Sequence, residues 1–242
     1  GFRFRFRNIA SLANDFNPSW RSNCDHWNID YVRLDNNRTI NDLTIHDIAF
    51  VYPMQSLLKQ YEAMPWRHYQ NNTDIELREN PVVMFKNNDD KKRLVELLRF
   101  EFDDLTGTVE SYGVDAGTYN MPVNHTEVFD KSFTYTLNSN SEDSAVIQVR
   151  CSISTDDFDP VCNNIIEYKQ KFSDYYAYDD GTAENGYGIA GEGTRNAKLA
   201  YQFTNYLPVD SLFAIDMFFN HTLEDANRKY FYLTIWDDND GM

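Results

Sequence analysis

The chain has 242 residues, which is enough for one large domain or two of ordinary size. Hydrophobic residues make up 42% of it and aromatic residues 15%, so it can build a packed core. The formal net charge of −16 opposes binding to nucleic-acid phosphates and to anionic lipid, and we expect neither partner. No stretch approaches the roughly 20 apolar residues of a membrane span, so we expect no membrane insertion.

The first part of the chain, residues 1–37, contains two strand signals. Residues 2–7 alternate phenylalanine and arginine with a period of two, which places the two residue types on opposite faces of a strand. We expect these arginines to pair with carboxylates on a neighbouring strand; anion binding is the alternative. Residues 26–34 form the second signal. Because the chain begins in the middle of a strand, we interpret it as a fragment of a longer protein.

Residues 38–72 are predicted to form a structured connection. Residues 44–52 have strand character and end at a proline. The apolar spacing in 55–63 favours a short helix or a turn that stops before the next proline. We expect Trp66 and the two residues before it to anchor this connection against a domain.

Residues 73–172 consist of strand signals separated by polar turns. The predicted strands cover 82–86, 94–102, 129–137, 145–153 and 165–172. The segment 94–102 fits a helix or a strand, and we favour a strand with Val95 on the face opposite to Phe100 and Phe102. Strands at this spacing, without helices between them, predict an Ig-like or fibronectin-like sandwich.

The last part, residues 173–242, is predicted to open a further β module. Tyr176 and Tyr178 share one face of a strand, and a glycine-rich turn that permits positive φ follows them. Further extended runs cover 197–203, 211–219 and 229–236. These strands are too few for a complete sandwich, so the module is either truncated or completed by residues 1–37.

Three stretches carry a resemblance to a known group of proteins. They read HWNIDYVRLD at 26–35, SLLKQYEAMPWRHYQ at 56–70 and YAYDDGTAENGYGIAGEG at 176–193. Together they resemble large secreted proteins of Bacteroidetes bacteria, which end in a type 9 secretion sorting domain and carry jelly-roll and Ig-like modules upstream of it. The resemblance implies a secreted protein or one on the outer cell surface. No sorting domain is recognisable in these 242 residues.

The resemblance also implies a domain organisation for an all-β chain that is clipped at both ends. Residues 1–37 resemble the terminal strands of a jelly-roll (galactose-binding-like) module. Residues 38–72 are the connection, and 73–172 form the Ig-like sandwich. Residues 173–242 resemble the first strands of a second jelly roll.

Carboxylates in turns are the candidate metal ligands. Asp179, Asp180 and Glu184 surround a glycine, and together they could hold a structural Ca²⁺, which takes six to eight oxygen ligands. The tail 237–241 has a similar composition but lacks the distal Glu of an EF-hand. Turns of Asp, Asn and Gly also have this composition for purely conformational reasons, so the alternative is a chain without any cofactor.

Aromatic residues beside turns are the candidate ligand-binding groups. Trp20, Trp66 and Tyr187 could each stack against a sugar ring. The alternative is that they pack in the core, as most aromatic side chains of a small sandwich do.

No catalytic constellation is recognisable, so we assign no catalytic residue and expect that the chain is not an enzyme. It contains no G-x-S-x-G nucleophile elbow, no phosphate loop and no pair of histidines at metal-ligand spacing. Cys151 and Cys162 could join neighbouring strands of one hairpin, although unpaired buried thiols are equally expected. Cys24 stands alone.

These patterns favour a non-catalytic scaffold, spacer or adhesin-like segment of a secreted or cell-surface protein. The alternative is a carbohydrate-binding module attached to a glycan-degrading or proteolytic enzyme outside this fragment. Part of a hydrolase is a third hypothesis. The expected partners are other modules of the same chain, and beyond them a glycan or another surface protein.

Overall fold

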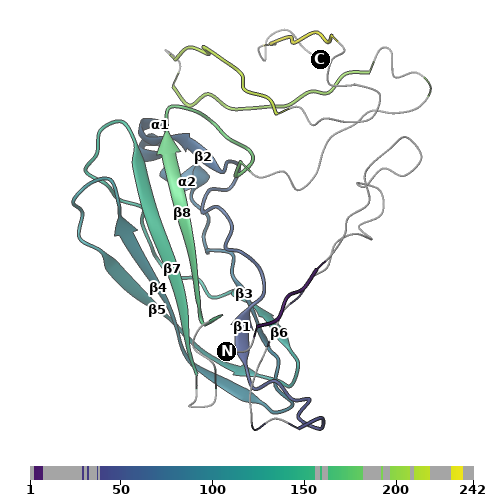
Figure 1. The fold of residues 1–242 in the computed structure, drawn as a ribbon. Coiled ribbons are helices and arrows are strands. Elements are labelled where there is room, and N and C mark those ends of the chain that lie inside the picture. The colour runs from purple at the N-terminus through teal and green to yellow at the C-terminus, as the bar shows by residue number, and fades with distance from the viewer. Residues whose placement is uncertain are drawn as a thin grey trace. The chain divides into compact units, whose positions relative to one another are not determined.

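The computed structural model describes residues 3–7, 29, 32, 37, 39–155, 159, 163–181, 192, 197–207, 210–218 and 230–236. The chain divides into two compact units. Unit 1 combines Gly1–Arg38, Gly186–Ala190 and Ser211–Met242, and unit 2 combines Thr39–Asn185 and Gly191–Asp210. Every helix and strand of the described residues belongs to unit 2 (Figure 1). The division predicted from the sequence, at residues 37, 72 and 172, stays a prediction.

Unit 2 is mostly β, with two sheets and two short helices in the described residues. The smaller sheet has the order β1-β3-β6, with β1 at Ile48–Phe50, β3 at Met84–Asn87 and β6 at Thr126–Val128. The larger has the order β2-β8-β7-β4-β5, with β2 at Ala63–Pro65, β8 at Ile165–Ser173, β7 at Ala145–Thr155, β4 at Arg93–Asp104 and β5 at Tyr112–Met121. Helices α1 (Trp66–Asn71) and α2 (Thr73–Glu76) lie at the end of β8, opposite to the smaller sheet (Figure 1). The described residues are thus mostly β, as the fold-class prediction expected, and their two sheets are consistent with a β-sandwich.

Strand β4 lies between β7 and β5 and confirms the choice of a strand for 94–102. The predicted division of its two faces is wrong at one end. Val95 is fully buried and belongs to the same core as Phe100 and Phe102. The register against β5 shifts between Val95 and Leu98, and such an irregularity reverses which residues face inward. A strict period of two therefore fails across this point.

The segment 129–137 was predicted to be a strand, but it forms no ladder with either sheet. It nevertheless has the predicted alternation of buried side chains, because its rings cover the inner face of β4. The Phe133 and Phe100 rings lie 5.1 Å apart, and the Tyr135 and Phe102 rings lie 5.3 Å apart. The alternation of apolar residues in this segment therefore predicts which side chains are buried, but it does not predict strand pairing.

The turn alternative, and not the helix, is correct for 55–63. Backbone groups here bond to a distant segment: Arg78 N donates to Leu57 O at 2.9 Å, and Lys59 N donates to Glu76 O at 2.7 Å. These groups are therefore not available for i to i+4 bonds within a helix. Helix α1 begins only at Trp66, directly after a proline, which supplies no backbone donor.

Strand β5 was not predicted. Its sequence contains Gly113 and Gly117, and glycine weakens the strand signal of a sequence. Strand β5 is instead held extended by its ladder with β4. Conversely, the described residues of four predicted strands form no ladder: 3–7, 197–203, 211–218 and 230–236. The prediction that Tyr176 and Tyr178 share a face fits their contacts, because both rings pack against Tyr61.

Cys151 is a free thiol buried in β7, so the alternative of a bridge to Cys162 is wrong for this structure. Burial raises the pKa of this thiol, and a thiol of this kind reacts slowly. Cys24 and Cys162 lie outside the described residues. Within the described residues, no helix combines the length and the apolar character that a membrane crossing requires.

Candidate functional site

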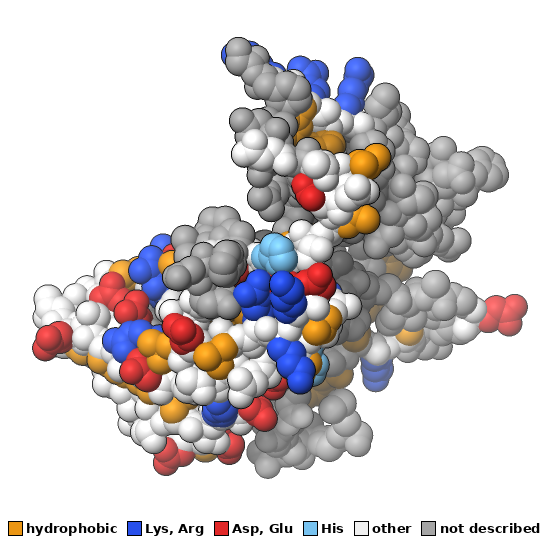
Figure 2. Space-filling model, turned by 90° about the horizontal axis from the view of Figure 1, so that it is seen from below, with side chains coloured by type: hydrophobic (Ala, Val, Ile, Leu, Met, Phe, Trp, Pro, Cys, Tyr) orange, Lys and Arg blue, Asp and Glu red, His pale blue; other side chains and the backbone are white. Residues whose placement is uncertain are grey.

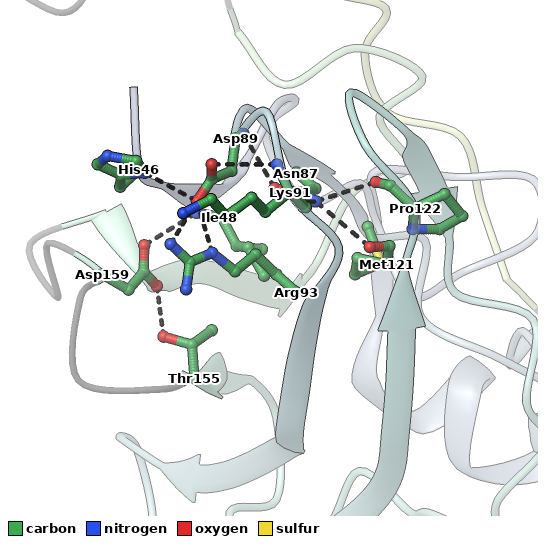
Figure 3. A network of polar contacts seen from close by, with 10 residues as sticks. All are labelled: His46, Ile48, Asn87, Asp89, Lys91, Arg93, Met121, Pro122, Thr155 and Asp159. Carbon is green, nitrogen blue, oxygen red and sulfur yellow. Dashed lines mark hydrogen bonds and ion pairs between the residues drawn. The ribbon is translucent and has the colours of Figure 1, made fainter. Parts of the chain in front are cut away.

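A network of polar side chains joins β1, the turn after β3 and the beginning of β4 (Figure 3). The turn contains two asparagines followed by two aspartates, residue types that favour turns because their side chains bond to nearby backbone. Asp89 is the centre of the network, and its side chain is fully buried. Its Oδ2 lies 3.0 Å from His46 Nδ1 and 2.5 Å from both Arg93 Nε and Arg93 Nη2.

Asn87 fixes the same turn to the end of β5. Its Nδ2 donates to the carbonyl oxygens of Lys91 at 2.8 Å and of Pro122 at 2.9 Å, and its Oδ1 accepts from Asp89 N at 3.0 Å. Asn87 is itself fully buried. This one amide therefore bonds to backbone groups of the turn and of the end of β5, and so joins the two.

The ionisation of Asp89 is set by two opposing effects. Burial alone would raise the pKa of this carboxyl. Hydrogen bonds from His46, Asp90 and Arg93, together with the charge of Arg93, outweigh burial and hold the pKa well below its usual range. Asp89 is therefore a carboxylate at all moderate pH values.

His46, Asp89 and Asp90 also have the geometry of a possible metal site. One ligand atom from each lies within 4.8 Å of the others. However, the guanidinium of Arg93 already neutralises Asp89 and contacts Oδ2, the same oxygen that His46 contacts. A cation could bind only if Arg93 moved away, so this trio serves better as a clamp on the turn.

A second carboxylate, Asp159, reaches the same end of β1 from the other side (Figure 3). Its Oδ1 accepts from Ile48 N at 2.8 Å, and its Oδ2 accepts from Thr155 Oγ1 at 2.6 Å and from Asn164 Nδ2 at 2.7 Å. Burial and the nearby charge of Asp47 raise the pKa of Asp159, although these hydrogen bonds act in the opposite direction. The two aspartates in Figure 3 thus have pKa shifts of opposite sign.

A third constellation lies at the opposite end of β8, where an imidazole stands between a carboxylate and a phenol. His68 of α1 is nearly buried, with Nε2 3.1 Å from Asp210 Oδ2 and Nδ1 2.5 Å from the Tyr176 hydroxyl. This order resembles a nucleophile, base and orienting acid. Desolvation by burial raises the pKa of Tyr176 to about 12, whereas a nucleophile needs a lowered pKa. The arrangement therefore acts as a tie between α1 and the segment around Asp210.

Of the three residues predicted to stack against a sugar, the structure describes Trp66. Trp66 is only 1% exposed, and its Nε1 donates to Ser141 O at 3.0 Å, so its ring has no open face for a sugar. It is instead the predicted anchor of the connection. Trp20 and Tyr187 lie outside the described residues.

The predicted calcium turn is described only in part. Asp179 is exposed, and its Oδ1 accepts from Gly181 N at 2.9 Å, which is the bond expected of an Asx turn. Gly181 has a φ of +90°, the conformation that glycine was expected to allow. Asp180 is also exposed, and Glu184 lies outside the described residues, so the trio stays a prediction.

The outer face of the larger sheet carries a shallow groove of about 390 Å³. Arg99, Arg150, Gln148 and Tyr112 are among its lining residues, and Gly113 leaves a gap in β5 over which the Arg99 guanidinium lies. Arg99 pairs with Asp115 at 2.5 Å, and Arg150 pairs with Glu167 at 2.9 Å. Acidic and basic side chains are likewise interspersed over the described residues in Figure 2.

Searches against models of known protein families, curated proteins and solved structures found no match to this chain. The resemblance to Bacteroidetes surface proteins, and the location and function that it implies, therefore stay predictions. The polar groups at β1 were not identified from the sequence, because His46 and Asp89 are 43 residues apart. The run of Asn and Asp after β3 is a local signal, but alone it predicts only one of the polar turns between the strands.

Proposed function

We propose that the chain is a non-catalytic β-sandwich segment of a secreted or cell-surface bacterial protein, with a scaffold or adhesin-like role. In this proposal an Ig-like sandwich is flanked by jelly-roll segments, and type 9 secretion is the export route. One observation carries the non-catalytic part. The ionisable groups that converge in unit 2 bond to backbone or to one another, as Asp89 does with Arg93 and Asp159 does with Ile48 N.

The environment of Tyr176, the phenol next to His68, supports the same proposal. A base in this position would have to activate Tyr176, yet burial raises the pKa of that hydroxyl to about 12. The test is a panel of chromogenic ester, glycoside and phosphate substrates, applied to the chain and to Tyr176→Phe. We expect no turnover by either protein. Turnover that disappears in Tyr176→Phe would refute the non-catalytic assignment.

Location is tested separately, in a bacterium that expresses the full-length protein. Protease added to intact cells should remove the segment from surface-anchored protein, or the segment should be recovered from the culture medium. Retention inside intact, protease-treated cells would contradict a secreted or surface location.

A carbohydrate-binding module is the second candidate, and the groove over Gly113 favours it. The groove volume falls in the range of small-ligand sites, and its guanidinium and amide groups can bond to sugar hydroxyls. Gly113→Thr would place a Cβ too close to the Arg99 guanidinium and so displace that group within the groove. The φ of Gly113 is not positive, and threonine suits a strand. Asn120→Thr, an exposed site on the same strand, is the matched control.

The assay is native gel electrophoresis through soluble neutral polysaccharides. Retardation that Gly113→Thr abolishes and Asn120→Thr retains would establish the binding module. Equal migration with and without polysaccharide would leave the scaffold proposal as the better account.

A further inference from the structure

Among the described residues, the larger sheet ends in β2 on one side and in β5 on the other. An end strand presents backbone N–H and C=O groups with which another chain can pair. At β2 the backbone itself closes the edge, because Glu62 N donates to Ala177 O at 2.7 Å and Ala177 N donates to Ala63 O at 2.9 Å. Within the described part of the chain, β5 forms a ladder with β4 alone. The edge of β5 is therefore closed, if at all, by side chains.

Residues 131–136, which we call the guard segment, lie along β5 without forming a ladder. Lys131 Nζ donates to Thr118 O at 2.7 Å. At the other end, the Tyr112 hydroxyl donates to Thr136 O at 2.5 Å and accepts from Thr136 N at 2.9 Å. Residue numbers rise along the guard segment as they fall along β5, so the two run antiparallel. They are joined by side chains, each of which reaches a backbone group of the other segment.

Lys131 lies where β5 is irregular. The register against β4 shifts on both sides of Leu98, whose partner Gly117 has a φ of +104°. A Cβ at position 117 would lie 3.1 Å from Lys131 Nζ, and this ammonium is also 3.8 Å from the centroid of the Tyr119 ring. Local irregularity and a lysine at the edge are two devices by which proteins prevent a strand from pairing with another chain.

We propose that the guard segment keeps β5 from adding a strand of a second copy of this chain. Thr118 has no partner in the register with β4, and the ammonium of Lys131 occupies its carbonyl oxygen, an acceptor that an incoming strand would otherwise use. A second copy is the expected partner because it carries the same edge, and two identical antiparallel edges can pair about a two-fold axis.

The test is sedimentation equilibrium of the complete chain at about 5 to 500 µM, in about 150 mM NaCl to screen distant charges. Lys131→Met removes the ammonium and keeps an unbranched side chain. We expect it to raise the association constant at least about tenfold, because pairing no longer has to break a hydrogen bond from a charged group. The chain has a net charge of −16, so loss of a positive charge would by itself weaken self-association. A rise therefore has the opposite sign to a general charge effect.

The matched control is Lys169→Met, at an exposed position of β8, which lies between β2 and β7 and is not an end strand. It should leave the association constant unchanged. Thr118→Lys, added to Lys131→Met, should reverse the rise because it places a charge on the edge again. Circular dichroism of each variant checks that the native fold is kept.

Tyr112→Phe tests the other end of the guard segment. It keeps the ring against Phe102 and loses both bonds to Thr136, so it should raise the association constant by a smaller factor. Unchanged association in Lys131→Met and Tyr112→Phe would overturn the proposal. An equal rise in Lys169→Met, or a rise that Thr118→Lys does not reverse, would also overturn it. If Lys131→Met does not fold, the comparison of Tyr112→Phe with wild type decides.

Discussion

Replacement of Trp66 separates its two predicted roles, as a sugar platform and as an anchor in the core. Its ring packs against Tyr69 at a centroid distance of 5.5 Å and against Phe172 at 4.9 Å. These partners lie on α1 and on β8, so Trp66 joins the helix to the larger sheet. Trp66→Ala would leave a cavity at this junction, and Trp66→Phe would keep most of the packing.

The expected magnitudes follow from burial. A buried tryptophan removes about 200 Å² from water, worth roughly 5 kcal/mol at about 25 cal/mol per Å². Partial collapse of the cavity brings the expected cost of Trp66→Ala to about 4 kcal/mol. Trp66→Phe loses the bond to Ser141 O and some ring volume, and should cost about 2 kcal/mol.

The assay is urea unfolding at 25 °C, followed by far-ultraviolet circular dichroism. With a slope near 2 kcal/mol per M, Trp66→Ala should lower the midpoint by about 2 M. Tyr175→Ala is the control, because this ring is 50% exposed and its loss should change stability by less than about 0.5 kcal/mol.

Two results would refute the reasoning. One is a cost of Trp66→Ala below about 1 kcal/mol with the same slope, which would mean that the ring is not part of the core. The other is loss of polysaccharide retardation in Trp66→Phe without any loss of stability, which would show that the ring contacts a ligand.

Three further changes test the polar and thiol groups of unit 2. Asp89→Asn should cost about 2 kcal/mol near pH 7. Because the folded-state pKa of Asp89 lies well below its unfolded value, this contribution is full above about pH 5 and declines steadily as the pH falls from about 4 toward the folded-state pKa. The difference between the urea midpoints of wild type and variant should therefore shrink between about pH 5 and pH 2, and an undiminished difference at pH 2 would contradict the prediction. Gln170→Leu should lower the free energy of unfolding by about 3 kcal/mol in the same urea assay, because the buried Gln170 amide bonds to three backbone or hydroxyl groups around Leu57. Lys171→Leu, at the exposed neighbouring position, should change the free energy of unfolding little. Equal effects of the two substitutions would refute this role of Gln170. In a chain with the other two cysteines changed to serine, the thiol of Cys151 should resist a disulfide reagent at pH 8 until urea unfolds the protein, and rapid native labelling would show that it is not buried.

Local alternation in the sequence predicted the strands that became β4, β7 and β8. Each has enough apolar residues at a period of two to specify an inward face without any knowledge of the partner strand. The same signal failed at 129–137, where alternate burial arises from ring packing and not from a ladder. Strand β5 was not predicted because its two glycines weaken the alternation of apolar residues, although the strand forms through its ladder with β4.

The sequence by itself determined the β class, the aromatic core and the polar turns, because these depend on side-chain type and near neighbours. Only the tertiary structure decided which polar groups meet. Asp47 and Asn163 are 116 residues apart, and nothing local to either one indicates the other. The burial of Trp66 was likewise decided by β8 and α1 packing around it, since exposure depends on what the rest of the chain places over a ring.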